Sequence, residues 1–237
     1  MNIKELLSVL PKLVKYNLKI IFAGKFMWFL LAAFIFLMIF MVQAVLSNKV
    51  LSEGFIYEIL FMPGLLLIFY PSVFGIQNDE DNKILEIIFG IPNYRYKVWL
   101  LRLVIIYLAI ALILVMFGYA AKYLLYPVNP FEIVARLMLP VMFVGNMAFM
   151  LSTLVRSGNG TAVVVILLAI AFMFFSSSLG LDNSMWDVTL NPFDMPQNIH
   201  PLIWGNIVFK NTLFLAIGGL ALLMIGLLNL QKREKFV

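Results

Sequence analysis

Long apolar runs alternate along the chain with short polar segments, and this pattern predicts six membrane-spanning helices. Each run has roughly the 20 residues that an α-helix needs to cross a hydrocarbon core about 30 Å thick. Because lipid offers no partners to the backbone, runs of this length are expected to be helical. The predicted spans are Phe26–Leu46, Phe55–Gln77, Trp99–Ala121, Leu137–Val155, Thr161–Leu181 and Asn211–Leu230. We therefore expect an all-α membrane protein with one transmembrane domain over residues 26–237.

The segment before the first span, residues 1–25, has polar and apolar positions separated at helical spacing. Polar residues recur every three or four positions at Lys4, Ser8, Lys12, Lys15 and Lys19. Leucines and other apolar residues occupy the opposite face, which predicts an amphipathic helix lying in the membrane interface. A solvated lead-in to the first span is the alternative.

Composition supports a membrane protein and excludes several kinds of site. Hydrophobic residues make up 63% of the chain and charged residues 12%, against roughly 45–50% and about 25% in soluble domains. The chain has no Cys and a single His, His200, so disulfides and thiolate metal sites are excluded and a histidine metal site is not expected. The longest segment between spans, the outer loop 182–210, is rich in Pro and Trp and is predicted to form an ordered cap with its Trp rings at headgroup depth.

The basic residues predict the orientation of the chain. If both termini are cytoplasmic, thirteen of the 17 Lys and Arg residues fall on the cytoplasmic side, as the positive-inside rule requires. These are Lys4, Lys12, Lys15, Lys19, Lys25, Lys83, Arg95, Lys97, Arg102, Arg156, Lys232, Arg233 and Lys235. The other four are Lys49, Lys122, Arg136 and Lys210. The net charge of +5 therefore indicates topology and contact with anionic lipid, and nucleic acid is not an expected partner.

Motifs for catalysis are missing from the sequence. A phosphate-binding GxxxxGK[ST] loop is absent, so this chain is not expected to hydrolyse ATP by itself. One His cannot form HExxH, and a serine protease pairing of His200 with Ser157 would have to cross the membrane. No pair of carboxylates lies in the middle of a span, which weakens a proton-driven carrier. We therefore predict that the chain is not an enzyme and has no cofactor of its own.

Between the second and third spans, residues 79–92 combine acidic and large apolar residues. The acids Asp79, Glu80 and Asp81 come first, and the run ILEIIF at 84–89 surrounds Glu86 with apolar side chains. At 100° per residue this run has one apolar face. It predicts a short helix that a soluble partner could bind, with the acids at its N-terminus, where they favour the helix dipole. A solvated loop is the alternative.

Three shorter features complete the sequence pattern. Residues 156–160, RSGNG, predict a tight turn whose glycines permit positive φ. Asn146, inside the fourth span, is expected to form hydrogen bonds between helices. Glu58, near the outer end of the second span, is expected to be an interfacial residue, because a carboxylate there still reaches water. Pro63 and Pro71 in the same span predict a kink.

Together these features resemble the permeases of ABC-type-2 exporters. That family has six spans, an amphipathic elbow helix before the first, and a loop after the second in which an acid precedes a Gly-Thr-Leu-Glu-like run, a Pro and a basic segment. The corresponding residues are Glu80, Asp81, Asn82, Lys83, Ile84, Leu85, Glu86, Pro92, Arg95, Lys97 and Arg102. Asn82 replaces the usual Gly and Lys83 the usual Thr. The stretches LSTLVRSGNG at 151–160 and Asn-Pro-Phe at 191–193 are also similar to the family.

The resemblance implies a function and its partners. Residues 79–92 would form a coupling helix that docks on a separate ATP-binding cassette ATPase, which holds ATP and Mg. Two permease subunits, identical or different, would pair with two ATPases in the cytoplasmic (inner) membrane of a prokaryote. The expected docking residues are Glu80, Asp81, Ile84, Leu85, Glu86, Phe89, Arg156 and Ser157. The residues alone leave three alternatives: an ATPase-independent secondary carrier or channel, a membrane scaffold that recruits a cytosolic partner, and an intramembrane enzyme.

Overall fold

The computed structural model describes residues 25–46, 51–81, 83, 95–155 and 157–233. The secondary-structure elements among these residues are all helices. The helices are α2 (Phe26–Leu46), α3 (Glu53–Asp81), the π-helix η1 (Arg95–Leu100), α5 (Leu101–Leu124), α6 (Pro130–Leu154), α7 (Gly158–Phe175) and α8 (Pro201–Arg233). Within these ranges, six helices are long and apolar enough to cross a membrane. The predicted all-α fold with six spans is confirmed.

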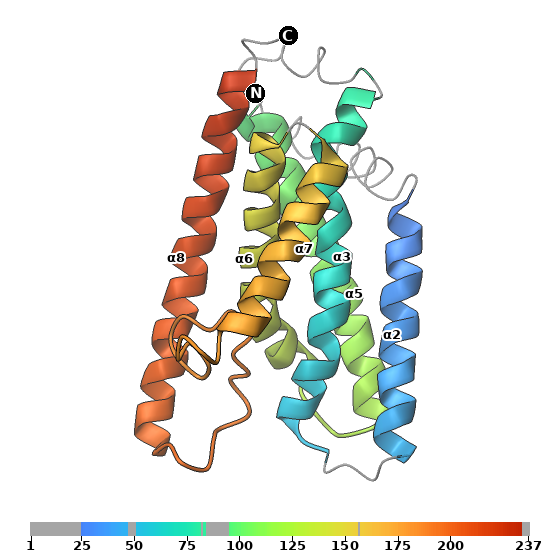
Figure 1. Ribbon diagram of the computed structural model, residues 1–237. Coiled ribbons are helices and arrows are strands. Elements are labelled where there is room, and N and C mark those ends of the chain that lie inside the picture. The colour runs from blue at the N-terminus through green and yellow to red at the C-terminus, as the bar shows by residue number, and fades with distance from the viewer. Residues whose placement is uncertain (1–24, 47–50, 82, 84–94, 156, 234–237) are drawn as a thin grey trace, which may run out of the picture.

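Successive spans run in opposite directions, so the bundle has two distinct ends (Figure 1). Helices α3, α6 and α8 finish at one end, which we name the Asp81 end, and α2, α5 and α7 begin there. The other is the Pro130 end, where α6 begins. The described basic residues sort between the two ends as the sequence predicts, with Lys25, Lys83 and Arg102 at the Asp81 end. That this end meets the cytoplasm stays a prediction.

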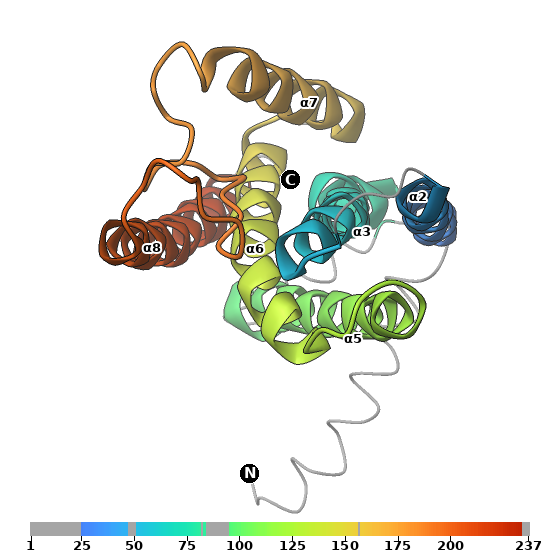
Figure 2. The same cartoon turned by 90° about the horizontal axis from the view of Figure 1, so that it is seen from below.

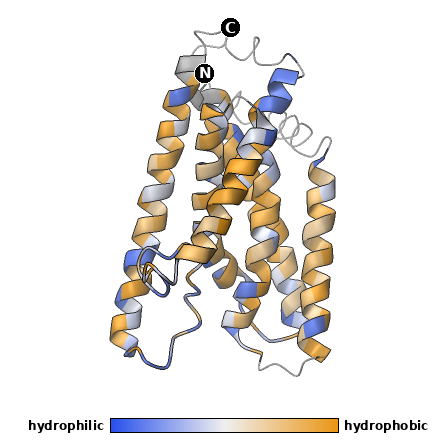
Figure 3. Cartoon of the chain, in the orientation of Figure 1, coloured by the Kyte–Doolittle hydropathy of each residue, from blue (hydrophilic) through white to orange (hydrophobic). Residues whose placement is uncertain are grey.

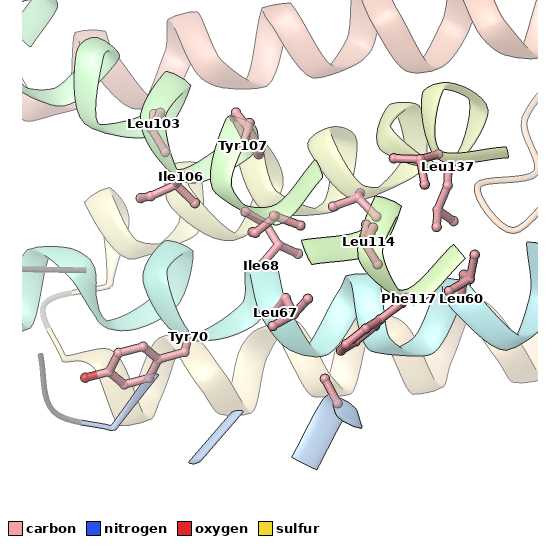
Figure 4. Close-up of a cluster of buried hydrophobic side chains, with 14 of the residues drawn as sticks. Leu60, Leu67, Ile68, Tyr70, Leu103, Ile106, Tyr107, Leu114, Phe117 and Leu137 are labelled. Atoms are coloured by element: carbon pink, nitrogen blue, oxygen red, sulfur yellow. The ribbon is translucent and has the colours of Figure 1, made fainter. Parts of the chain in front are cut away.

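Helices α3, α5 and α6 form the centre of the bundle, as the view along the helices shows (Figure 2). Helix α2 packs against α3, and α8 packs against α6. The core contains Leu67 and Ile68 of α3, Leu114 of α5 and Leu137 of α6, all fully buried (Figure 4). In water, the hydrophobic effect would drive burial of such side chains. In lipid, van der Waals packing between them holds the helices together.

Helix α7 lies apart from this centre (Figure 2). In the most apolar stretch of α7, 17% of the residues are buried, against 61% in α3. Its buried residues, Gly158, Thr161 and Val165, all belong to its first two turns or so. The rest of α7 exposes large apolar side chains such as Met173 and Phe174, as a lipid-facing helix does. Apolar residues indeed cover most of the bundle's length (Figure 3).

A buried hydrogen-bond chain joins three of the helices and confirms the prediction for Asn146. The Tyr107 hydroxyl on α5 donates to Asn146 Oδ1 on α6 at 2.6 Å. Asn146 Nδ2 in turn donates to the Gly219 carbonyl oxygen of α8 at 3.1 Å. Because an unsatisfied amide is costly in hydrocarbon, these partners fix the relative rotation of the three helices.

The boundaries of the last three spans differ most from the prediction. The fourth span begins at Pro130, seven residues before the predicted Leu137. The fifth span ends at Phe175, six residues before the predicted Leu181. Three serines follow, and Ser side chains compete with the helix for backbone hydrogen bonds. The last helix begins at Pro201, ten residues before the predicted Asn211, because Pro favours the first helical position and the helix extends beyond the apolar run. The loop predicted over 182–210 is therefore 176–200.

This loop is ordered by side-chain hydrogen bonds, as predicted for the cap. Asp187 accepts hydrogen bonds from the backbone of Asn183 and Thr189. Asn211 Nδ2, on α8, donates to the carbonyl oxygens of Met185 and Asp187. Of the Trp side chains near the loop, Trp204 is buried, and the depth of the Trp rings in a membrane stays a prediction.

Candidate functional site at the Asp81 end

The C-terminal turns of α3 extend beyond the apolar band of the bundle. Helix α3 has 29 residues, about 44 Å at 1.5 Å per residue, whereas the hydrocarbon core is about 30 Å thick. It continues as one helix through Pro63 and Pro71. At the Asp81 end it passes the ends of α2 and α7 (Figure 1), and its last turns are hydrophilic (Figure 3).

The three acids lie at the C-terminus of α3, and the prediction that they begin a new helix is wrong. An acid at a helix C-terminus opposes the helix dipole, so the sequence favoured placing them at the start of the next helix. In the structure, one of the three acids, Asp79, forms an ion pair that offsets this unfavourable position. Asp79 is buried, 1% exposed, while Glu80 and Asp81 are exposed at the helix end.

Asp79 forms a buried ion pair with Arg102, near the start of α5. Arg102 Nη1 lies 2.5 Å from Asp79 Oδ2, and Arg102 is only 6% exposed. The guanidinium also lies 4.9 Å from the centre of the Trp99 ring, within cation–π range. In this low-dielectric position each charge needs the other, because an isolated buried charge is strongly unfavourable. The pair therefore joins α3 to α5.

A second contact joins α3 to the start of α7. The Gly158 backbone N–H donates to Gln77 Oε1 at 2.6 Å. Ser157, the N-cap residue of α7, accepts a hydrogen bond from the Gly160 N–H through its hydroxyl at 3.1 Å. The two side-chain oxygens satisfy N–H groups that a helix start leaves without partners.

The glycines of the predicted 156–160 turn have a different role from the predicted one. Gly158 and Gly160 lie inside α7, and among the described glycines only Gly180 has positive φ. Gly158 is needed for close approach: a Cβ there would overlap Gln77 Oε1 and lie 2.6 Å from Phe74 Cδ1. Helix α7 can approach α3 only because this side chain is missing.

We name Gln77, Asp79, Arg102, Ser157 and Gly158 the three-helix junction. It links the ends of α3, α5 and α7 by one ion pair and one hydrogen bond between elements. Because both links are buried or partly buried, a displacement of the end of α3 would be transmitted to the other two helices. Glu80 and Asp81 continue α3 past the junction toward solvent.

We expect Gly158→Ala to weaken the contact between α3 and α7. The added methyl group must displace Gln77 and Phe74, and overpacking of this kind costs typically about 1–3 kcal/mol. The melting temperature in detergent, followed by tryptophan fluorescence, should fall by a few degrees. Asn159→Ala, at an exposed position in the same turn, is the control and should leave it unchanged. Equal melting temperatures for the two variants would contradict the close approach.

Few of the predicted docking residues can be placed. The structure puts Glu80 and Asp81 at the exposed end of α3 and Ser157 at the N-cap of α7. It brings these two helices together through Gln77, which the sequence did not single out. The remaining docking residues, Ile84, Leu85, Glu86, Phe89 and Arg156, lie outside the described residues. So do the coupling helix beyond Asp81, apart from Lys83, and the interfacial helix predicted for residues 1–25, apart from Lys25.

The Asp79–Arg102 pair also escaped the sequence prediction, although a signal for it existed. Asp79 follows the predicted end of the second span and Arg102 lies just inside the start of the third. Spans joined by a short segment are antiparallel neighbours, so opposite charges at matching depth can meet. In the part of the chain that the structure describes, no three His, Asp or Glu side chains form a group that could hold a metal ion.

The fold and the junction define a helical, multi-pass membrane protein whose second span extends from one face of the membrane domain. Comparison of the chain with known protein families, curated proteins and solved structures finds no match.

Proposed function

We propose that this chain is the transmembrane permease subunit of an ABC exporter. It moves substrate across the cytoplasmic (inner) membrane of a prokaryote when a separate ATP-binding cassette ATPase, with ATP and Mg, drives it. Two permease subunits pair with two such ATPases. The observation that carries the proposal is the extension of α3 beyond the apolar band, where the three-helix junction attaches it to α5 and α7.

The junction explains how a soluble partner could move membrane helices. An ATPase bound at Glu80, Asp81 and the segment that follows would shift the end of α3. The Asp79–Arg102 pair resists separation of α3 from α5, because separated charges would remain buried. The Gln77 contact moves α7 with them. Since α3 also packs against α2 and α6, one movement at this end reaches most of the bundle.

The acidic residues of the structure favour the permease over a proton-driven carrier. Among the described acids, only Asp79 and Asp187 are buried. Asp79 is engaged by Arg102, and Asp187 belongs to the loop at the Pro130 end. A proton relay needs an ionisable group that can change its charge inside the membrane. A partner that hydrolyses ATP supplies the energy instead.

The test is co-purification of the tagged chain from its native host, with bound proteins identified by mass spectrometry. One variant combines Glu80→Lys with Asp81→Lys, and a second combines Leu85→Asp with Glu86→Arg. The matched control combines Glu53→Lys with Glu132→Lys, which reverses two exposed acids at the Pro130 end. We expect a cassette ATPase with the wild type and the control, and at least a tenfold loss with the other variants, since buried-interface charge reversals cost several kcal/mol.

Recovery of no cassette ATPase with folded wild-type protein would overturn the proposal. Transport in liposomes separates the alternatives. Flux that survives removal of Mg and ATP but stops when an ion gradient collapses would indicate a secondary carrier. Recruitment of a cytosolic protein without any flux would indicate a scaffold.

A further inference from the structure

A pocket opens between α2 and α3 near the Pro130 end, far along α3 from the three-helix junction. Its volume is about 260 Å³. The residues that define its character are Phe36, Phe40 and Gln43 from α2 and Phe55, Glu58 and Met62 from α3. On each helix these residues recur at spacings of three or four, so two facing helix surfaces form the pocket.

Within the described part of the chain, no cation pairs with the negative charge of Glu58 in this pocket. The side chain of Glu58 is exposed, and the ion pairs of the described residues do not include it. Glu58 Oε1 accepts a long hydrogen bond, 3.5 Å, from Asn191 Nδ2, which makes its shorter bond, 2.9 Å, to the Gly54 carbonyl oxygen. A carboxylate in an apolar pocket with so weak a partner attracts positive charge.

Aromatic rings provide the rest of the recognition. Phe36 and Phe40 are stacked, with ring centroids 4.3 Å apart, and Phe55 of α3 also lines the pocket. Aromatic faces attract cations, and organic ammonium groups most of all when the site excludes water. Phe rings cannot accept a strong hydrogen bond, so they favour an alkylated ammonium over a hydrated metal ion.

We propose that this pocket binds an organic ammonium ion with a small apolar body, its charge beside Glu58 and its apolar part against Phe36, Phe40 and Phe55. The volume is slightly below the range of about 300–1,000 Å³ typical of drug-sized ligands, which suits a compact cation. The proposal goes beyond the permease function and does not rest on it, because binding requires no ATPase. A lipid headgroup and a free cation share this chemistry.

The test measures binding of benzyltrimethylammonium to the full-length protein in nanodiscs by isothermal titration calorimetry. Its neutral carbon isostere, neopentylbenzene, controls for apolar binding. Glu58→Gln removes the charge and keeps the shape, and Phe40→Leu removes an aromatic face. Glu132→Gln, an exposed acid at the same end of the bundle on α6, is the matched control.

We expect Glu58→Gln to raise the Kd for the cation about tenfold or more and Phe40→Leu to raise it severalfold. Glu132→Gln should leave it unchanged, and the isostere should bind wild type and Glu58→Gln alike. An unchanged Kd in Glu58→Gln, or an isostere that binds as tightly as the cation, would overturn the proposal.

The choice of lipid in the nanodisc distinguishes the two possible sources of the ammonium group, a lipid headgroup and a free cation. In nanodiscs of phosphatidylglycerol, which has no ammonium group, the pocket is free for the probe. If the ratio of the Kd of Glu58→Gln to that of wild type falls toward one in phosphatidylcholine discs, the lipid headgroup is the occupant. If the ratio is the same in both, the site selects free cations.

Discussion

Replacing Arg102 by alanine should destabilise the bundle more than any other single truncation at the Asp81 end. The substitution leaves Asp79 buried without its partner. Removal of one member of a buried ion pair costs about 3–5 kcal/mol, because the remaining charge keeps its desolvation penalty. We expect a lowered melting temperature and a reduced yield of monodisperse protein in size-exclusion chromatography.

The matched control is the double substitution Asp79→Leu with Arg102→Met. It removes both charges and replaces them with apolar side chains of similar size, a change that is often neutral or stabilising. The double variant should therefore recover most of the stability that Arg102→Ala loses. If Arg102→Ala and the double variant are equally unstable, loss of packing and not the unpaired charge is the cause.

Gly145→Ala should have the second large effect, because Gly145 of α6 lies directly against side chains of both α3 and α5. An added Cβ would lie 2.5 Å from Ile68 Cγ1 and 2.9 Å from the Tyr107 hydroxyl oxygen. Relief of this overlap must move α6 and disturb the hydrogen bond from Tyr107 to Asn146. Overpacking costs typically about 1–3 kcal/mol, and a lost hydrogen bond adds about 1 kcal/mol. Unfolding in an SDS titration should begin at a lower SDS fraction.

Gly75→Ala is the control for this prediction. Gly75 is also helical, but no atom outside its own helix backbone and chain neighbours lies within 4 Å of a Cβ placed there. The substitution should be neutral or should stabilise α3 by up to about 1 kcal/mol, because alanine loses less backbone entropy than glycine. The same SDS midpoint for both variants would contradict a close approach at Gly145.

The sequence predicts the number and type of the helices well, because hydrocarbon imposes the same length and polarity on every span. The first predicted span, Phe26–Leu46, agrees with α2 at both ends. The prediction is poorer where a helix leaves the membrane. Polar residues such as Asn78 or Lys210 end an apolar run, but α3 continues past Asn78 to Asp81 and α8 includes Lys210.

The candidate site was predictable only in part. Asn146 was assigned correctly, because a polar side chain within lipid must find a partner and neighbouring helices provide one. Gln77 carried no such signal, since an amide at the end of a span can equally face water. Its contact with Gly158 depends on how α7 packs, and packing between segments distant in the chain is not visible in a local pattern.

The attachment of α7 has a mechanical consequence. The buried residues of α7 are confined to the segment from Gly158 to Val165. Helix α7 is therefore attached to the bundle at one end, beside the three-helix junction. Its 18 residues span about 27 Å at 1.5 Å per residue. A tilt of about 10° about this attachment would therefore carry Phe175 about 5 Å sideways, so a small rotation of α7 at the junction becomes a larger displacement at its other end.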